Sequence, residues 1–332
     1  MSKSNGIIII LAYPDTVVKP SKRDVLSKFL PYLGIGNKIG IQAGHAALLL
    51  IKKGVPEINY FDFGRYITTY KNGRVRSKET DFELHIPILA KFDKASLSNL
   101  DEILVWLEGH PEKTHGEGRM VASVNEEIDY EKALTFINGC VKQKEIPYGA
   151  FIRNGSNCAR FVTDTLRTST LQKKIKTKLT ISYLCTPSPI GNVLKGRTVN
   201  NIYQIYNTEV APYNNRSILK EYKDCFFNKY NTLPSIIEDE IQKKSLFYSK
   251  KGTWLAGCGS GAWFTIEEKI NTTTYKISRY TYAEKKDFEG VFKISENSFD
   301  MSLEYQFTHP TNCLEAFIVQ DKKKFTFRRI TD

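Results

Sequence analysis

The chain has 332 residues, of which 41% are hydrophobic and 25% are charged. This is the composition of an ordinary globular protein, it excludes intrinsic disorder, and the length accommodates two domains with a core in each. The formal net charge is +12, and residues 151–200 alone carry nine bases against one acid. Such a segment favours an anionic surface or substrate as a partner, and we expect no specific nucleic acid.

Six cysteines are spread along the chain without a Cys-x-x-Cys pair, at positions 140, 158, 185, 225, 258 and 313. This spacing excludes a zinc ribbon and argues against a disulfide framework. His110 and His115 lie in a polar loop together with Glu112 and Glu117. Because no rigid helical spacing joins these side chains, we expect neither a metal nor another cofactor.

The N-terminal elements predict a sheet. Residues 7–13 form an apolar strand that is too short to span a membrane and lacks the features of a cleaved signal peptide. We therefore expect a soluble chain that is cytoplasmic or is exported by a signal-independent route. Residues 45–51 and 58–63 predict a hairpin, and residues 67–76 predict a second one with Asn72 and Gly73 at its tip.

Further along, residues 82–89 predict a strand, and apolar residues recur at helical spacing over 100–107 and 133–141. The segment 156–168 predicts a helix, with Ser156 and Asn157 as good N-cap residues. Its apolar stripe has helical spacing and consists of Cys158, Phe161, Val162, Thr165 and Leu166. Cys158 is therefore expected in the first turn, on the side that faces the core.

The C-terminal part of the chain has a different pattern of apolar residues and turns. Residues 214–243 predict two helices separated by Pro234, and from Leu246 onward six or seven short strands alternate with turns. Together these patterns predict an α+β protein with a first domain over 1–200, a helical connector over 201–245 and a β-rich domain over 246–332.

Three residues offer the parts of a thiol nucleophile site. The helix start at Cys158 favours a negative sulfur, and His45, at the head of an apolar strand, is a candidate base. In the predicted hairpin residue 45 lies opposite residues 62 to 64, so Asp62 can orient the histidine, with Asn59 as a weaker candidate. The alternatives are a structural cysteine, and an Asp62 that pairs with Arg65 or Arg74.

A resemblance supports the catalytic interpretation. The hexamer Asn157-Cys-Ala-Arg-Phe-Val162 and the preceding Gly44-His-Ala-Ala-Leu-Leu-Leu-Ile51 resemble motifs of the circularly permuted NlpC-type papain-like enzymes, which include YiiX-like and lecithin:retinol acyltransferase-like proteins. The resemblance implies a permuted papain-like core, an antiparallel sheet packed on helices. It also implies that Cys158 is the nucleophile, that His45 is its base and that Asp62 is the third residue. The start of the last domain, Gly252-Thr-Trp254, resembles that of lipocalin-like barrels.

The expected function is a cysteine hydrolase that cleaves an amide, peptide or ester bond through an acyl-enzyme, with acyl transfer as a variant of the same chemistry. Peptides, amides and lipid esters are the expected substrates, and Tyr148, Asn157 and Arg160 are expected to line the substrate site. The alternative is a non-catalytic module that binds lipid or an anion and carries an inert Cys158.

Overall fold

The computed structural model describes residues 4–17, 42–213, 220, 221, 223, 252–257, 260–296 and 298–330. Within these ranges the chain combines helices with antiparallel sheets, which confirms the predicted α+β class. The helices predicted over 214–243 and the boundary predicted near 245 fall almost wholly outside them. Across the same ranges, none of the helices has both the length and the apolar character needed to cross a bilayer.

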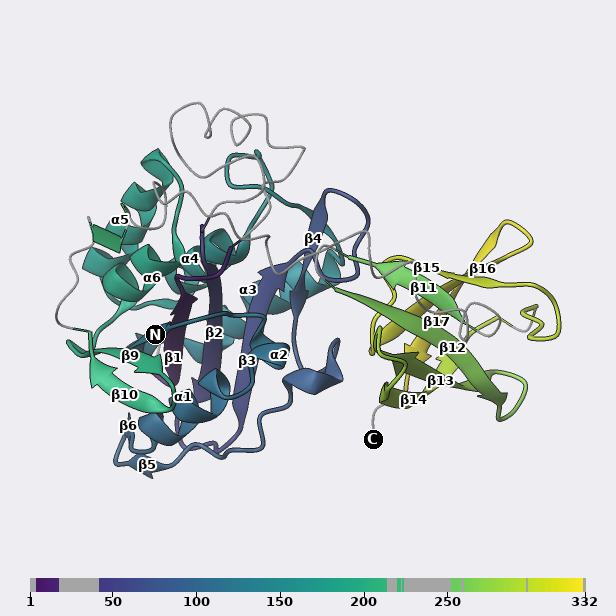
Figure 1. Ribbon diagram of the computed structural model, residues 1–332, viewed down its shortest axis with the longest axis horizontal. Coiled ribbons are helices and arrows are strands. Elements are labelled where there is room, and N and C mark those ends of the chain that lie inside the picture. The colour runs from purple at the N-terminus through teal and green to yellow at the C-terminus, as the bar shows by residue number, and fades with distance from the viewer. Residues whose placement is uncertain are drawn as a thin grey trace.

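Eight strands of the described residues form the first sheet, in the spatial order β10-β9-β7-β1-β2-β3-β4-β8 (Figure 1). The central strands β1 and β2 are apolar at nearly every position and are buried on both faces, as the sequence predicts. The bounds of these strands are Gly6–Tyr13 for β1, His45–Lys52 for β2, Ile58–Gly64 for β3, Asn72–Arg76 for β4, Met120–Ile128 for β7, Ile146–Pro147 for β8, Ile202–Tyr206 for β9 and Glu209–Pro212 for β10.

Helices cover both faces of the first sheet. On one face α3, α4 and α6 pack on Ile8, Leu48 and Phe63, and on the other face α1 packs on Ile9 and Leu49. The helical bounds are Leu100–Glu108 for α1, Pro111–Thr114 for α2, Tyr130–Lys142 for α3, Cys158–Ser169 for α4, Lys173–Ile181 for α5 and Pro189–Gly196 for α6, with 3₁₀ turns at Phe82–Leu84 (η3) and Ser182–Leu184 (η4). The short strands β5 (Phe92–Asp93) and β6 (Ser96–Leu97) form a separate pair.

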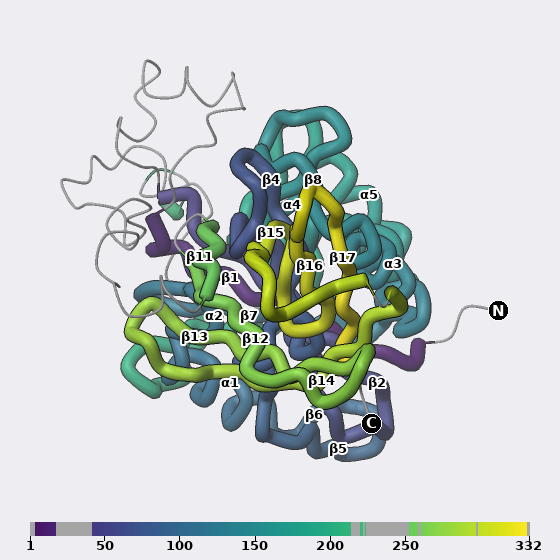
Figure 2. The backbone as a smooth tube through the Cα atoms, turned by 90° about the vertical axis from the view of Figure 1, so that its right-hand side faces the viewer, coloured from purple at the N-terminus to yellow at the C-terminus, as the bar shows by residue number. Residues whose placement is uncertain are grey.

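The C-terminal sheet, residues 253–329, lies beside the β4 end of the first sheet (Figures 1 and 2). Its seven antiparallel strands within the described residues agree with the six or seven predicted, in the order β11-β12-β13-β14-β17-β16-β15. They do not form a simple meander, because β14 pairs with β17 and not with β15. The two edge strands approach each other, since the amide of Phe307 donates to Oγ1 of Thr253 at 3.0 Å. The bounds are Thr253–Ala256 for β11, Gly261–Lys269 for β12, Thr274–Tyr280 for β13, Lys286–Ile294 for β14, Gln306–Thr308 for β15, Glu315–Gln320 for β16 and Lys323–Arg329 for β17.

The structure confirms the hairpin predicted over residues 45–63. The hairpin predicted over residues 67–76 is wrong, because its turn does not lie at Asn72 and Gly73. Strand β3 pairs with β4, with Asp62 opposite Arg76 and Gly64 opposite Arg74, so the chain reverses over residues 65–71. Asn72 and Gly73 begin β4 instead of forming a tip. The glycine is required inside the sheet, because a Cβ at position 73 would lie 2.7 Å from the ring of Phe63.

Three other segments differ from the prediction. Residues 82–89 contain the 3₁₀ turn η3 and no strand within this described segment; Leu84 and Ile86 are buried without strand pairing, so their alternation reflects burial alone. Strand β7 was not predicted, because Ser123 and Asn125 interrupt its apolar pattern; both are buried and donate to carbonyls of α6. The predicted helical connector begins as β9 and β10, which extend the first sheet.

Candidate active site

Cys158 is the first residue of α4, as the sequence predicts. The side chain of Asn157 caps the helix, because its Oδ1 accepts a hydrogen bond from the amide of Arg160 at 2.8 Å. The predicted stripe is buried, and Cys158 itself is 7% exposed within the core that α4 shares with the sheet. The fold therefore places the sulfur at a helix N-terminus, where the backbone amides of the first turn have no partner inside the helix.

His45 is the first residue of β2 and is 7% exposed. It follows Gly44, whose φ of +72° turns the chain into the strand, and a Cβ at Gly44 would meet the carbonyl of Tyr13 at 3.0 Å. The ring stacks on Tyr13, with 6.2 Å between the centroids. Its Nε2 lies 3.2 Å from Oδ2 of Asp62, so Nδ1 is the ring nitrogen that does not face this carboxylate.

Asp62 is completely buried in β3 and is the centre of a hydrogen-bond network. The guanidinium of Arg76 holds it with two bonds, from Nε to Oδ1 at 2.9 Å and from Nη2 to Oδ2 at 2.5 Å. The hydroxyls of Tyr60 and Tyr66 donate to Oδ2 at 3.1 and 3.4 Å. A carboxylate with this many donors has one fixed orientation toward His45.

The surroundings shift the pKa values of Asp62 and His45 in opposite directions. Burial alone would raise the pKa of Asp62, but the charge of Arg76 and the hydrogen bonds from His45 and Arg76 hold that pKa well below its ordinary value. Burial lowers the pKa of His45, but hydrogen bonds to Asp62 and to Cys158 outweigh it and raise the pKa to about 9. The site therefore favours an ionised carboxylate beside a protonated imidazole at neutral pH.

The alternatives considered for this arrangement, Asn59 in place of Asp62 and Arg74 as the partner of Asp62, lie elsewhere. Asn59 pairs in register with Leu50, well along the hairpin from His45. Arg74, one of two arginines considered as a partner of Asp62, instead forms a bidentate ion pair with Asp81 at 2.5 and 2.6 Å. The arginine on Asp62 is Arg76, which the sequence analysis missed. The signal that identifies it is the β3–β4 register, which puts residue 76 directly opposite residue 62.

The three residues expected to line the substrate site have structural contacts of their own. The Tyr148 ring stacks on Phe63 at 6.0 Å and lies under Arg65. Nη1 of Arg160 donates to the carbonyls of Gly149 and Ile152 at 3.2 and 2.9 Å, so its guanidinium braces the loop before α4. Asn157 caps α4. A role of these side chains in binding substrate stays a prediction.

His115 is a buried residue next to the site. Its ring lies 5.0 Å from that of Tyr66, and burial, reinforced by the charge of Arg76, lowers the pKa of His115 to about 3. It is therefore neutral at physiological pH. Among the described residues, no group of three His, Cys, Asp or Glu side chains has the arrangement of a metal site.

A comparison with protein-family models assigns the chain to a family. The model of the type VI secretion system effector TseH-like family matches residues 8–175, a segment that contains His45, Asp62 and Cys158. The chain belongs to the TseH-like family. Residues 252–330 match a second model, the DUF6695 C-terminal domain, over the same span as the C-terminal sheet.

Among solved structures, a crystal structure of the type VI secretion system effector TseH is similar to this TseH-like chain. The match has a TM-score of 0.41 and 14% sequence identity, and it covers 64% of this chain and 99% of the other. A comparison with curated proteins finds no match.

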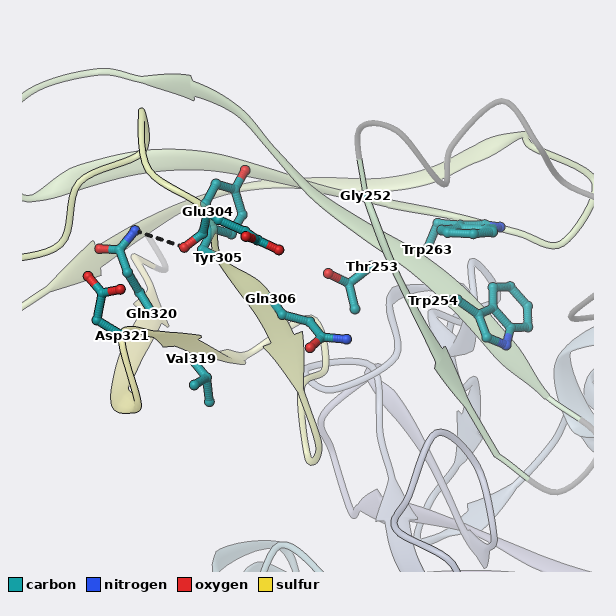
Figure 3. A pocket seen from close by; sticks show the side chains of 10 residues that line it. All are labelled: Gly252, Thr253, Trp254, Trp263, Glu304, Tyr305, Gln306, Val319, Gln320 and Asp321. Carbon is teal, nitrogen blue, oxygen red and sulfur yellow. Dashed lines mark hydrogen bonds between the residues drawn. The ribbon is translucent and has the colours of Figure 1, made fainter.

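A separate pocket of about 740 Å³ lies in the C-terminal sheet of this TseH-like chain (Figure 3). Trp254 and Trp263 lie together at one end of it, with ring centroids 5.4 Å apart, and Glu304, Gln320 and Asp321 lie toward the other. All ten residues that line it lie in the segment 252–321, so it contains none of the predicted site residues.

The cap on α4 predicts a measurable contribution of Asn157 to stability. We expect Asn157→Ala to lower the free energy of unfolding by about 1 kcal/mol, because one amide of the first turn loses its acceptor. Asn157→Asp keeps an acceptor and is expected to retain the stability. Urea unfolding of both variants measures the difference, and equal destabilisation by the two substitutions would contradict the capping role.

The raised pKa of His45 predicts a pH-dependent stability. A folded-state pKa of about 9 against an ordinary 6.5 means that folding favours the protonated ring, so this stabilisation is complete below about pH 6.5 and is lost as the pH rises through 9. Between pH 6 and pH 9.5 the wild type is expected to lose up to about 3 kcal/mol more than His45→Gln. Parallel unfolding curves at the two pH values test this, and an equal loss in both proteins would refute it.

Proposed function

We propose that this TseH-like chain is a cysteine hydrolase that cleaves an amide or peptide bond through an acyl-enzyme intermediate. The observation that carries the proposal is the placement of His45, which opens β2 and hydrogen-bonds to the buried carboxylate of Asp62. Cys158 opens α4, which packs on the same strand, and its thiol contributes to the raised pKa of His45. A nucleophile, a base and a group that orients the base are the three parts that thiol catalysis requires. The resemblance to permuted papain-like enzymes supports the same assignment.

In the proposed mechanism, the Cys158 thiolate attacks the carbonyl carbon of the substrate and a tetrahedral intermediate forms. In this mechanism, the backbone amide at the start of α4 donates to the developing oxyanion. The intermediate collapses when protonated His45 gives its proton to the leaving amine, and the C–N bond breaks. His45 then removes a proton from water, whose oxygen attacks the thioester carbon. The C–S bond breaks, the acid leaves, and the Cys158 thiolate is restored beside protonated His45.

The partners of Asp62 explain how the site keeps His45 in place. The ion pair with Arg76 keeps the carboxylate charged, and that charge stabilises the imidazolium in each half of the reaction. If an amine or alcohol replaces water in the second half, the same residues perform acyl transfer. Product analysis with and without an added amine or alcohol acceptor distinguishes the two outcomes, because hydrolysis gives the free acid in both cases and acyl transfer gives an amide or ester when the acceptor is present.

The family description concerns type VI secretion system effectors. We infer that this chain is also exported through a secretion system of that type, in agreement with the signal-independent route considered from the sequence. Detection of the chain in culture supernatant, dependent on an intact secretion system, tests this inference.

Acyl-enzyme trapping tests the proposed function. We expect a p-nitrophenyl ester or a peptide anilide, quenched in acid, to leave an acyl adduct on Cys158 that intact-mass and peptide mapping detect. Cys158→Ala serves as the negative control, and the exposed Cys185 in the same chain reports unspecific acylation. An adduct that forms equally on Cys185, or none on Cys158, contradicts the proposal.

A further inference from the structure

The reversal between β3 and β4 is shared by the two sheets. Ile67 belongs to this reversal in the first sheet, yet its side chain is 5% exposed and is part of the core of the C-terminal sheet, with Leu255, Phe264 and Phe307. The C-terminal sheet lies beside the β4 end of the first sheet in Figure 1 and in front of it in Figure 2. One residue of the first sheet's own connection is thus a core residue of the other sheet.

The backbone at this point is held under strain. Ile67 has a φ of +43°, which is a costly conformation for a β-branched residue and persists only where the surroundings enforce it. Gly257, after β11, packs directly on this backbone, since a Cβ there would lie 2.1 Å from the amide nitrogen of Ile67 and 2.6 Å from the carbonyl of Arg65. The C-terminal sheet therefore clamps residues 65–67 by backbone contact as well as by apolar burial.

The neighbouring residue, Tyr66, faces the candidate active site. Its hydroxyl donates to Asp62, and its ring lies 3.7 Å from the guanidinium of Arg76. Its carbonyl accepts a hydrogen bond from Nε of Arg74 at 2.8 Å. Any movement of the reversal therefore moves one donor of Asp62 and the ring that supports its ion-pair partner.

A second connection between the C-terminal sheet and the residues around Asp62 runs through Arg279 on β13. This side chain is 3% exposed, and its guanidinium pairs with Asp287 at 2.9 Å, with Glu83, and with Asp81 at 3.6 Å. Asp81 is the bidentate partner of Arg74, and Arg74 holds the carbonyl of Tyr66. The segment after β4 is also fixed directly, because the amide of Cys313 donates to the carbonyl of Thr80 at 2.9 Å.

We propose that the C-terminal sheet positions the catalytic residues: by burying Ile67 and by pairing Arg279 with Asp81, it fixes Tyr66 and Arg76 against Asp62. This inference rests on the proposed function, and it makes Ile67 and Arg279 positioning residues that touch no substrate. The C-terminal sheet then has a role in the activity of the site that is independent of any ligand in its own pocket.

The full-length Ile67→Gly variant tests the proposal. Glycine accepts a positive φ without strain, so the fold is retained while the buried anchor is removed. Lys144→Gln is the matched control, because Lys144 also joins the two sheets, through Glu315 at 2.9 Å, but does not contact the Asp62 network. Arg279→Lys is the second variant, which keeps the charge and loses the planar fork that spans several carboxylates.

Two readouts are needed, one of which is independent of catalysis. Histidine-selective NMR titration of His45 reports its pairing with Asp62 whether or not Cys158 reacts, and iodoacetamide labelling of Cys158 reports reactivity. In Ile67→Gly we expect the pKa of His45 to fall from about 9 toward 6.5 and labelling to slow about tenfold. Arg279→Lys is expected to change both in the same direction, and Lys144→Gln to change neither.

The outcomes separate this proposal from the proposed function. A wild-type pKa of His45 in folded Ile67→Gly and Arg279→Lys overturns the positioning role. If the pKa falls as expected but wild-type Cys158 forms no acyl-enzyme, the positioning is upheld and the hydrolase assignment fails. If Lys144→Gln changes both readouts as strongly, any weakening of the contact between the two sheets has this effect. The specific connection through Ile67 and Arg279 is then not its cause, and the proposal is wrong.

Discussion

Replacement of Cys158 by alanine is expected to remove hydrolysis of any acyl substrate, with a loss of at least about 10³-fold, while the fold is retained. Removal of the nucleophile leaves only substrate binding and oxyanion stabilisation, which supply a small residual rate. The substitution removes one buried sulfur atom and leaves a small cavity, so we expect a loss of stability of only about 1 kcal/mol. Steady-state rates with the ester and anilide substrates, together with circular dichroism, measure the two effects.

Cys140 provides the matched control for this prediction. It is a partly buried free cysteine on α3 that packs against the same core, and burial raises the pKa of its thiol to about 11. Cys140→Ala is therefore expected to keep the full rate. A Cys158→Ala protein that is folded and still hydrolyses the substrates at the wild-type rate would show that another group is the nucleophile.

The largest expected loss of stability follows from Arg76→Met. The substitution removes the only guanidinium that binds Asp62 among the described residues, where the carboxylate is fully buried. The donors that remain are the hydroxyls of Tyr60 and Tyr66 and the ring of His45. Breaking a buried ion pair from one side costs about 3–5 kcal/mol. Urea unfolding at pH 7.5 measures this loss, and the deficit should shrink at acidic pH as Asp62 takes up a proton.

An exposed ion pair serves as the reference for Arg76. Lys91 and Glu102 pair at 3.0 Å on the surface, with both side chains about half exposed or more, so Lys91→Gln is expected to leave the unfolding midpoint unchanged. If Arg76→Met behaves like Lys91→Gln, the network around Asp62 does not hold the site together in the way its hydrogen bonds indicate.

The sequence predicts the parts of the site that are local. The apolar pattern of β1 and β2 and the cap and stripe of α4 are properties of a few adjacent residues, and the structure confirms them. The hairpin of β2 and β3 brings residue 62 within reach of residue 45 because its turn is short. Motif and chain order therefore indicate His45, Asp62 and Cys158 as a candidate site from the sequence alone, and their catalytic role stays a prediction.

The parts that the sequence did not predict depend on distant contacts. Arg76 is recognised as the partner of Asp62 only when β4 is known to begin at Asn72, and the Asn-Gly pair there indicates a turn that long-range packing overrides. Strand β7 contains buried polar residues whose partners lie on α6, some 70 residues away. The burial of Ile67 in the C-terminal sheet joins residues far apart in the chain, so no local sequence pattern predicts it.

The most direct test of the central claim is the rate of iodoacetamide labelling of Cys158 at pH 6, with Cys185 in the same molecule as the reference. At this pH an ordinary thiol is almost wholly protonated. If His45 activates the nucleophile, the buried Cys158 is labelled faster than the exposed Cys185, and His45→Ala reverses that order. Labelling of Cys158 that is slower than that of Cys185 in the wild type, and unchanged in His45→Ala, would contradict the account.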